Sequence, residues 1–396
     1  MKRDKPEPYT LAKIKVVGVG GAGGNAVTRM FGNLPRSVDL LAINTDVQDL
    51  NYNLAKKKIH IGKNVTRGLG TGMNPDLGRQ AAEENRTEIT ESLRGADMVF
   101  VTAGFGGGTG SGAAPVIAEI AREMGILTVA VITKPFTFEG AKRSQIATEA
   151  LIKLRDRVDT LITIPNDRIF SLIDNDTPMT KAFEEIDEVL KNSVQGITEL
   201  IVAPGIVNVD FADVKAIMQD SGSAIIGIGR ATGAERSTNA ATMALNSPLL
   251  DISIDGAKGV LFSVSGQRDL RMNEVNDIAR LISESVDPAA KIIFGTYHDR
   301  RLKKGQIKVT LIATGFNGMF NKNSYIGPTL FERSPSDISR KVDSEATFPI
   351  VEDETHGRSL FSEGEATPAS KEKERSAKEK EDVWDIPAFM RKRKRK

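Results

Sequence analysis

The sequence predicts an α/β fold in which a mostly parallel sheet carries helices on both faces. Strands alternate with helices along the first half of the chain, and glycine-rich loops follow several of these strands. A long helical period of apolar residues then extends from Thr177 to about Val202. At roughly 1.5 Å per residue this helix is about 36 Å long, enough to cross a domain. In such a sheet, ligands bind outside the carboxyl ends of the strands, so the loops there mark the expected site.

Composition narrows the class of protein before any motif is considered. The chain has 396 residues, enough for two or three domains, and no apolar run of the length that spans a membrane. The first ten residues are charged, so we expect no secretory signal. The absence of cysteine excludes disulfides and thiolate metal sites and suits a cytoplasmic protein. The net charge is only +2 although the last six residues are all basic, so we expect no nucleic-acid partner.

The first predicted strand, residues 14–19, leads directly into a glycine-rich turn and a helix that ends near Met30. Gly18, Gly20 and Gly23 match the GxGxxG spacing of dinucleotide-binding folds. A second strand, residues 40–43, ends at Asn44-Thr45-Asp46, which places Asp46 where such folds bind a ribose. At this point both a dinucleotide and a nucleoside phosphate fit the pattern.

Two further glycine-rich loops favour a triphosphate. The first, residues 68–72, precedes a predicted helix over 76–93. The second, residues 104–112, contains six glycines in nine positions and follows a buried strand over 97–103. We expect a helix over 113–124 after it, with Pro115 in the first turn. Backbone N–H groups and a helix N-terminus make such a loop an anion site, and without lysine it is no Walker A motif.

The remaining elements of the first half bring polar residues to the same edge of the sheet. A strand over 127–133 ends at the loop 134–140, and the helix that follows carries Arg143. Another strand, residues 160–164, ends at Pro165-Asn166-Asp167.

The long helix and the segment after it allow more than one interpretation from spacing alone. Phe183 and Asp187 lie one turn apart, which favours a core phenylalanine and a solvated aspartate. Asp210 and Asp213 follow Asn208 closely, and these residues suit either a cation or water site or, more simply, a turn and helix cap. A second αβ region follows, with helices over 211–219, 234–245 and 271–285 and strands over 223–230, 258–265, 290–297 and 306–314.

The composition changes beyond about Thr329. Serine, proline and charged residues dominate up to Glu381, which predicts a disordered tether. The segment from Val383 to Met390 holds the only tryptophan of the chain and predicts a peptide that docks on partners. The basic end, Arg391 to Lys396, suits contact with anionic lipid or a general partner-binding role.

Several motifs together give the chain a resemblance to a known family. They are Gly18–Asn25, Asn44-Thr45-Asp46, Gly68–Gly72, Gly106–Gly112 (GGGTGSG), Pro135–Gly140, Asn166-Asp167, Asn208–Val214 (NVDFADV) and the terminal Asp385–Phe389 (DIPAF). In these motifs the chain resembles the FtsZ family, the tubulin-like GTPases of bacterial cell division, over residues 11 to about 317 and the tail. The family signature more often ends in Thr-Gly, so Ser111 is a departure that keeps the hydroxyl.

The resemblance implies a tubulin-like domain organisation. We expect a flexible N-terminus (residues 1–10) and a Rossmann-like parallel-sheet GTPase domain (11–177). A central helix (178–203) joins this domain to a second α/β domain with a catalytic loop (204–317). A disordered linker (318–381) and a partner-binding peptide with a basic end (382–396) follow.

The resemblance also implies ligands and residue roles. GTP or GDP is expected in a site formed by Gly20, Gly21, Ala22, Gly23, Gly24, Asn25, Asn44, Gly72, Gly106, Gly107, Gly108, Thr109, Gly110, Glu139, Arg143, Asn166, Phe183 and Asp187. Asp187 would accept hydrogen bonds from the guanine N1–H and N2–H₂ groups, which adenine lacks as a pair, and Phe183 would stack on the base. Asn208, Asp210 and Asp213 would act with Mg²⁺ on the GTP of the next subunit.

The implied partners follow from the same family. The protein would form a head-to-tail homopolymer, and Val383 to Met390 would bind membrane tethers and regulators of the division ring. We therefore expect a cytoplasmic protein recruited to the inner face of the membrane at midcell.

Other function classes explain less of the chain. A nicotinamide-dependent dehydrogenase accounts for Gly18–Gly23 only, and His60, His298 and His356 all lie outside the glycine loops. A non-enzymatic scaffold accounts for the tether and tail only. A paralogue that binds GTP without dividing cells fits less well, because the NVDFADV motif and the terminal peptide are both complete.

Overall fold

The computed structural model describes residues 12–35, 37–171, 173–174, 176–202, 205–247, 253–299 and 301–316. The predicted tether, docking peptide and basic end all lie outside these residues. No helix in the described ranges combines the length and apolar character needed to cross a membrane.

The described residues form strands and helices in the alternation that the sequence predicts. The strands are β1 (Ile14–Val19), β2 (Val38–Asn44), β3 (Lys57–His60), β4 (Met98–Gly104), β5 (Leu127–Lys134), β6 (Thr160–Pro165), β7 (Gly205–Val207), β8 (Gly222–Thr232), β9 (Gly259–Gly266), β10 (Lys291–His298) and β11 (Gln306–Thr314). The α-helices are α1 (Gly20–Met30), α2 (Val47–Tyr52), α3 (Lys63–Thr66), α4 (Pro75–Glu84), α5 (Arg86–Leu93), α6 (Thr109–Glu123), α7 (Ala141–Arg155), α8 (Met179–Val202), α9 (Phe211–Met218), α10 (Arg236–Leu245) and α11 (Met272–Glu284). Two 3-10 helices, η1 (Thr137–Glu139) and η2 (Asn166–Ser171), follow β5 and β6.

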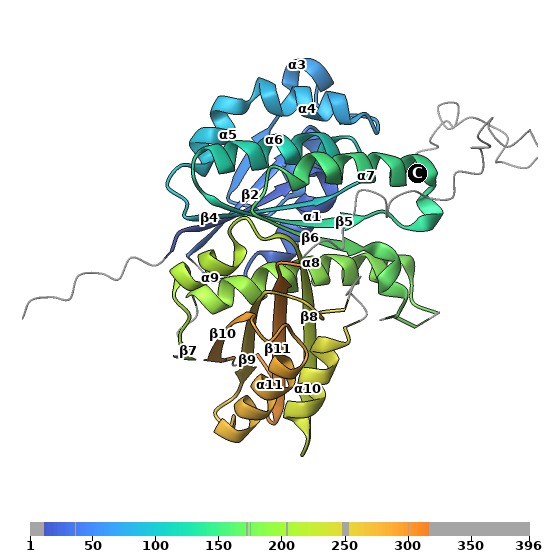
Figure 1. Cartoon of the computed structure of the whole chain (residues 1–396). Coiled ribbons are helices and arrows are strands. Elements are labelled where there is room, and N and C mark those ends of the chain that lie inside the picture. Colours follow the sequence, from blue (N-terminus) through green and yellow to red (C-terminus); the bar gives the residue numbers. More distant parts are fainter. Residues whose placement is uncertain are drawn as a thin grey trace, which may run out of the picture. The chain divides into compact units, whose positions relative to one another are not determined.

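The first half is the expected parallel sheet. Its strands lie in the order β3-β2-β1-β4-β5-β6, and every pair among them is parallel. One apolar core joins this sheet to α1 and α8, and a second core joins its other face to α4, α5, α6 and α7. Figure 1 shows these helices on the two sides of the sheet. The carboxyl ends of the strands therefore meet at one edge, where the predicted loops lie.

The second half continues the same sheet. β8 pairs with β6 in parallel, and β11, β9, β10 and β7 follow in that order. β11 is antiparallel to both of its neighbours. Helices α10 and α11 share an apolar core with one face of these strands, whereas residues of β8, β9 and β11 on the other face join the core of α8 and α9. The central helix is thus packed against both halves.

Two predictions of secondary structure were wrong in detail, and four short elements were missed. Helix α6 begins at Thr109, because Gly112 N–H already donates to the Gly108 carbonyl, so Pro115 lies inside the helix and not in its first turn. The helix expected over 76–93 is interrupted at Asn85, whose side chain accepts from the Gly62 N–H at 3.0 Å. The short elements α2, β3, α3 and β7 were not predicted.

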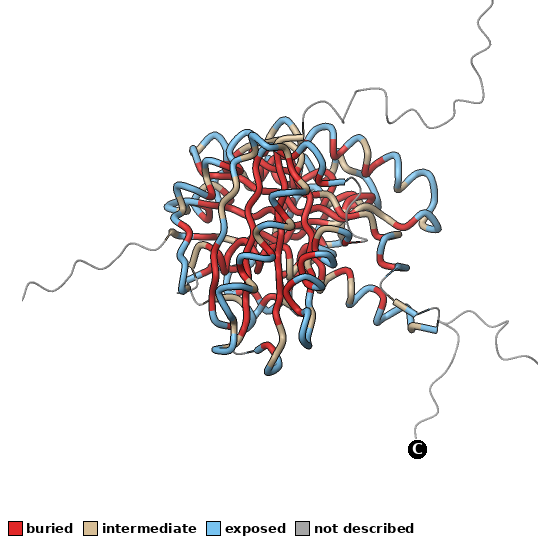
Figure 2. The backbone as a smooth tube through the Cα atoms, turned by 60° about the horizontal axis from the view of Figure 1, so that its bottom comes forward, coloured by how far each residue is buried: buried red, intermediate tan, exposed pale blue. Residues whose placement is uncertain are grey.

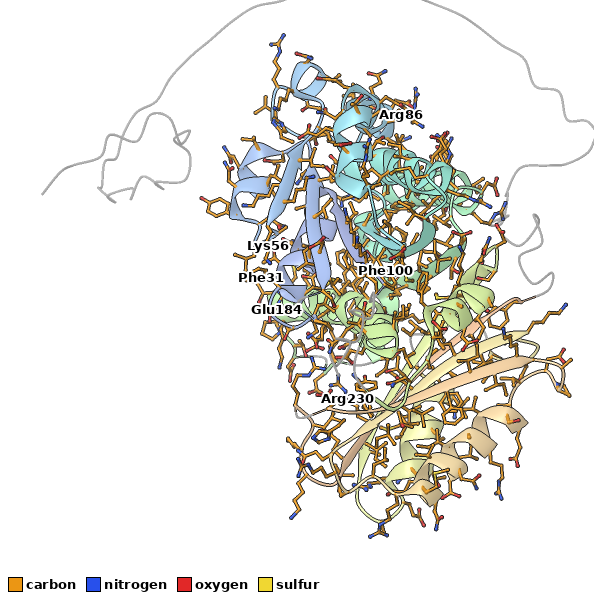
Figure 3. All side chains as sticks on the ribbon, turned by 90° about the vertical axis from the view of Figure 1, so that its left-hand side faces the viewer. Phe31, Lys56, Arg86, Phe100, Glu184 and Arg230 are labelled. Atoms are coloured by element: carbon orange, nitrogen blue, oxygen red, sulfur yellow. The ribbon has the colours of Figure 1, made fainter. Side chains whose placement is uncertain are left out.

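The core lies where the sheet meets its helices. In Figure 2 the buried residues gather in the interior of the molecule, and the exposed residues follow the outer turns of the chain. Phe100 of β4, which Figure 3 labels within this interior, is fully buried. Truncation of such a phenylalanine to alanine costs about 3–5 kcal/mol. The packed sheet thus positions the loops at its edge.

Candidate functional site

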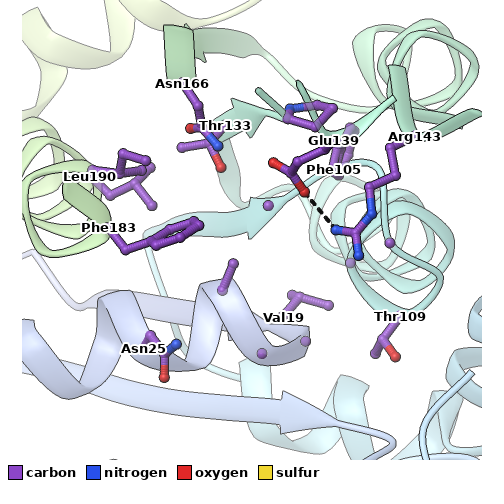
Figure 4. A pocket seen from close by; sticks show the side chains of 18 of the residues that line it. Val19, Asn25, Phe105, Thr109, Thr133, Glu139, Arg143, Asn166, Phe183 and Leu190 are labelled. Atoms are coloured by element: carbon purple, nitrogen blue, oxygen red, sulfur yellow. Dashed lines mark hydrogen bonds and ion pairs between the residues drawn. The ribbon is translucent and has the colours of Figure 1, made fainter. Parts of the chain in front are cut away.

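A pocket of about 460 Å³ lies at the carboxyl ends of the central strands. All three glycine-rich loops contribute to its wall, the 68–72 loop through Thr71 alone. The 3-10 helices η1 and η2, the first turn of α7 and the segment Phe183–Leu190 of α8 complete the wall, and Figure 4 shows most of these residues. Its lining is Val19, Gly20, Gly21, Ala22, Asn25, Thr71, Gly104, Phe105, Gly107, Gly108, Thr109, Gly110, Thr133, Pro135, Glu139, Arg143, Asn166, Phe183, Ile186, Asp187 and Leu190. The expected convergence of the loops on one edge is confirmed.

Two helices begin at this pocket without a capping side chain. Helix α1 follows Val19 and helix α6 follows Gly108, and neither of these residues provides a side-chain cap. The first turns of both helices, which the structure describes in full, contain no acidic residue. Their free N–H groups and helix dipoles therefore favour an anionic ligand at this end of the pocket.

The glycines of these loops serve packing as well as ligand binding. A Cβ atom on Gly23 would lie 2.3 Å from the Thr102 carbonyl oxygen, and one on Gly108 would lie 2.1 Å from the Thr71 hydroxyl. Neither approach leaves room for a side chain. A Cβ atom on Gly107, by contrast, would meet nothing within 4 Å. Gly107 thus leaves open space in the pocket, whereas Gly23 allows α1 to approach β4 and Gly108 allows its loop to approach the 68–72 loop.

Hydroxyl groups connect two of the glycine-rich loops with the loop that follows β2. The Thr109 hydroxyl lies 2.7 Å from that of Thr45 and 3.2 Å from that of Thr71. The Ser111 hydroxyl accepts from the Gly106 N–H at 3.0 Å, and Gly106 has a φ of 102°. Ser111 therefore holds the backbone of the loop through its hydroxyl and does not line the pocket.

The opposite end of the pocket is aromatic and acidic. Phe183 is 40% exposed and its ring packs edge-on against Phe136 at 5.7 Å, so the interpretation of Phe183 as a core residue was wrong. Asp187 is also not a solvated residue, because its side chain is only 14% exposed and accepts from Arg29 Nε at 2.9 Å. Burial raises the pKa of Asp187, although the bond from Arg29 opposes this effect.

An amide and an ion pair complete the polar wall. Asn166 is buried, and its Oδ1 atom has no hydrogen-bond partner among the described residues, so it can accept from a ligand. Arg143 pairs with Glu139 at 2.7 Å, as Figure 4 shows, and the same glutamate accepts from the Phe136 N–H. The pocket thus offers an anion site at one end and an aromatic, hydrogen-bonding site at the other.

The structure separates the predicted ligand residues into two groups. Those that line the pocket are Gly20, Gly21, Ala22, Asn25, Gly107, Gly108, Thr109, Gly110, Glu139, Arg143, Asn166, Phe183 and Asp187. Those outside the lining are Gly23, Gly24, Asn44, Gly72 and Gly106. Asn44 instead donates to Asp49 at 2.7 Å, and Asp46 caps α2 rather than facing a ribose.

Sequence reasoning missed some residues of the site. Thr71, Thr133, Ile186 and Leu190 line the pocket, and Arg29 holds Asp187. Ile186 and Leu190 follow Phe183 at helical spacing, so the same face of α8 could have been extended to them. No local pattern marks Arg29, since its partner is far away in the chain.

Asn208, Asp210 and Asp213 do not join the pocket. Asp210 is the N-cap of α9 and accepts from the Ala212 N–H, which confirms the capping interpretation, and Asp213 lies in the first turn of that helix. Asn208 Oδ1 accepts from the Gly205 N–H at 2.7 Å. Phe183 and Asp187 lie near the start of the 24-residue helix α8, whereas these three residues follow its other end. A helix of that length spans about 36 Å.

The fold and the pocket define an α/β protein that binds a phosphorylated ligand at the carboxyl edge of a parallel sheet. The GTPase-domain model of the tubulin/FtsZ family matches residues 13–174, and the model of the FtsZ family C-terminal domain matches residues 222–317.

Solved structures agree with these family models. An FtsZ dimer from M. jannaschii, described as empty, is 48% identical, with a TM-score of 0.75 over 78% of this chain and 90% of its own. CetZ1 from Haloferax volcanii, a GDP-bound monomer, is 22% identical, with a TM-score of 0.67 over 77% of this chain and 95% of its own. At that identity CetZ1 shows the fold alone.

The chain belongs to the FtsZ family of the tubulin/FtsZ superfamily, and it is a GTPase that binds guanine nucleotide. The family and fold implied by the sequence motifs are confirmed. The bacterial origin remains a prediction.

Proposed function

We propose that this protein polymerises head-to-tail and hydrolyses GTP at the interface between subunits, and that the filaments form the cytokinetic ring of a dividing bacterial cell. In this proposal the pocket holds the nucleotide of one subunit. Asn208, Asp210 and Asp213 of the next subunit complete the active site.

The observation that carries the proposal is the separation of the two half-sites by α8. The pocket uses residues near the start of this 24-residue helix, and the acidic loop follows its end. From Asp187 to the end of α8 at Val202 the helix extends by roughly 22 Å, at about 1.5 Å per residue, which keeps Asp210 and Asp213 of one subunit away from its own nucleotide. A second subunit stacked on the pocket would present its own acidic loop to that nucleotide.

The carboxylates of the pocket itself also support an active site that is shared between two subunits. Glu139 is paired with Arg143 and accepts from a backbone N–H, and Asp187 is paired with Arg29. In this proposal Asp187 binds the guanine base at the other end of the pocket from the phosphates, and Glu139 is held by its two partners, so neither carboxylate would orient the attacking water. The water-orienting groups would therefore come from outside the subunit.

The chemistry follows that of other phosphoryl transfers. Water attacks the γ-phosphorus, the bond to the β-phosphate oxygen breaks, and GDP and phosphate leave. The acidic loop would orient the water, and the N–H groups at the start of α1 and α6 would bind the phosphate oxygens. Mg²⁺ would neutralise phosphate charge. The described residues include no cluster of three or more acidic, histidine or cysteine side chains that could hold a metal, so Mg²⁺ would take most of its ligands from phosphates and water.

Polymerisation follows from the geometry of such an interface. A contact between the pocket of one subunit and the acidic loop of the next joins two different surfaces, so it repeats from subunit to subunit, and in this proposal the rotation between subunits does not close a ring. The related FtsZ from M. jannaschii was solved as a dimer, which supports self-association.

The role in division rests on the family and on the predicted tail. Val383 to Met390 would dock on membrane tethers and regulators, and Arg391 to Lys396 would add attraction to anionic lipid. The filament would then lie in the cytoplasm against the inner face of the membrane at midcell.

Mixing two inactive variants tests the shared active site. Asp213→Ala subunits should bind GTP and assemble but lose most phosphate release. Asp187→Ala subunits should bind GTP poorly while keeping an intact acidic loop. If the half-sites come from different subunits, an equimolar mixture should release phosphate faster than either variant alone.

Protein dilution provides a second measurement on the same material. GTPase activity per molecule should rise with concentration and parallel light scattering. Activity that is independent of dilution, or Asp213→Ala turnover like that of the wild type, would contradict the proposal.

A further inference from the structure

Helix α2 places a carboxylate beside the turn that begins α1. Asp49 Oδ2 lies 3.5 Å from the position of a Cβ atom on Gly21 and 4.0 Å from one on Gly24. Gly21 lines the pocket at the end that favours anions. Asp49 itself does not line the pocket, so its charge acts on the bound phosphates through space and not by contact.

The position of this carboxylate is fixed. Asn44 Nδ2 donates to Asp49 Oδ2 at 2.7 Å, and the Asp49 N–H donates to the carboxylate of Asp46. Asp49 is partly buried, and burial together with the nearby charge of Asp46 raises its pKa, against the effect of the bond from Asn44. The charged group that acts on Asp49 is thus another acid.

We propose that Asp49 lowers the affinity of the pocket for the phosphate chain of its nucleotide. The carboxylate supplies negative charge to the N-terminus of α1, whose described first turn contains no acidic residue. Phosphate must bind at the same helix end and therefore meets repulsion from Asp49. The charge of Asp49 therefore stabilises the ligand-free form of this helix end and makes release of the nucleotide more favourable.

The repulsion depends on the charge of the ligand. It is largest for GTP, smaller for GDP and absent for guanosine, because Coulomb interaction scales with charge. Salt weakens it, since Asp49 is only partly buried. Asp49 is thus an affinity-determining residue that does not contact the ligand. This inference rests on the proposed binding of phosphates at the start of α1.

The test replaces Asp49 with its neutral isostere. Asp49→Asn keeps an oxygen that accepts from Asn44 and removes the charge. Isothermal titration at low ionic strength should show roughly threefold to tenfold tighter GDP binding, a larger gain for GTP and no change for guanosine. The gain should shrink in 0.5 M salt. Asp49→Glu retains the charge and should show the wild-type order of affinities.

A matched control removes one charge elsewhere. Asp156 follows the far end of α7 and its side chain is 75% exposed, so Asp156→Asn should leave all three affinities unchanged. Unchanged or weaker GDP binding by Asp49→Asn would overturn the inference, as would an equal change for guanosine. A wild-type protein that fails to bind GDP at all would contradict the proposed nucleotide site as well, which distinguishes the two failures.

Discussion

The two ends of α8 carry buried carboxylates that perform different tasks. Asp187, near the start of the helix, has a side chain that is 14% exposed, and Glu199, near its end, has one that is 5% exposed. Each is paired with an arginine from a distant part of the chain, Arg29 or Arg301. One carboxylate faces the nucleotide pocket, and the other joins the central helix to the second half of the sheet.

The difference lies in the number of partners. Glu199 is surrounded by Lys308, Arg301, Tyr297 and Gln195, all of which bond to its two oxygens. Burial raises the pKa of Glu199, but Lys308 and the hydrogen-bond donors outweigh it and lower the pKa overall.

Asp187 receives far less compensation. Arg29 bonds to one of its oxygens and also pairs with Glu184, and burial raises the pKa of Asp187 in spite of that bond. A carboxylate has about four acceptor positions, so Asp187 retains capacity for the donors of a guanine base. Saturated hydrogen bonding thus marks a structural carboxylate, and incomplete hydrogen bonding marks one that is available to a ligand.

The largest effect is expected on stability at the saturated end. Glu199→Ala leaves Lys308 buried without its main counter-charge, so the free energy of unfolding should fall by about 3–5 kcal/mol. Urea denaturation followed by circular dichroism measures this change. Glu188→Ala, on the same helix, removes a half-exposed glutamate paired with Lys191 and should cost less than about 1 kcal/mol.

A double variant sharpens this prediction. Glu199→Met combined with Lys308→Met removes both charges and should recover much of the lost stability, because no buried charge is left unpaired. Equal destabilisation by Glu199→Ala and Glu188→Ala would contradict the assignment of Glu199 as the structural carboxylate.

A smaller effect is expected on binding at the ligand end. Asp187→Asn loses a charged acceptor for guanine donors, which weakens GTP binding by about 1.5–3 kcal/mol, or roughly tenfold to a hundredfold. ATP affinity should stay the same, so discrimination between the two nucleotides falls. Competition with a fluorescent GTP analogue measures both. Glu184→Gln, which removes the charge of the other partner of Arg29, is the matched control and should preserve the preference for GTP.

The smallest effect is expected on the pH dependence of stability, to which the two carboxylates contribute with opposite sign. The pKa of Glu199 is lowered in the folded state, so the stability it contributes is present above its ordinary value of 4.5 and is lost as pH falls below it. The pKa of Asp187 is raised above its ordinary value of 3.8, so ionisation of Asp187 reduces stability as pH rises from that value.

The free energy of unfolding of the wild type, Glu199→Gln and Asp187→Asn, measured between pH 7 and pH 4, tests these two opposite pH dependences. The advantage of the wild type over Glu199→Gln should shrink on acidification, whereas its stability relative to Asp187→Asn should improve. If the stability difference from the wild type changed with pH in the same direction for both variants, the two carboxylates would not differ as proposed.

The sequence predicted the elements whose patterns are local. Strands such as Ile14–Val19 and the long helix α8 are marked by apolar periodicity, and these predictions agree with the structure. The edge strand β3 was missed because its two consecutive lysines do not alternate with apolar residues, although lysine is typical of exposed strand edges. The break at Asn85 depends on a bond to Gly62, which no local pattern contains.

What the sequence determined by itself was the chemistry available at the sheet edge. Glycine loops after buried strands, an acidic motif and a family signature are all read from neighbouring residues, because backbone conformation and helix starts depend on short segments. These features were sufficient to predict a nucleotide site and the family.

Tertiary structure alone decided which residues work together. The pairing of Arg29 with Asp187, the saturation of Glu199, and the position of Asp49 beside Gly21 join residues from separate elements. Burial and hydrogen-bond satisfaction are properties of the packed chain. For that reason the same residue type is structural at one end of α8 and available to a ligand at the other.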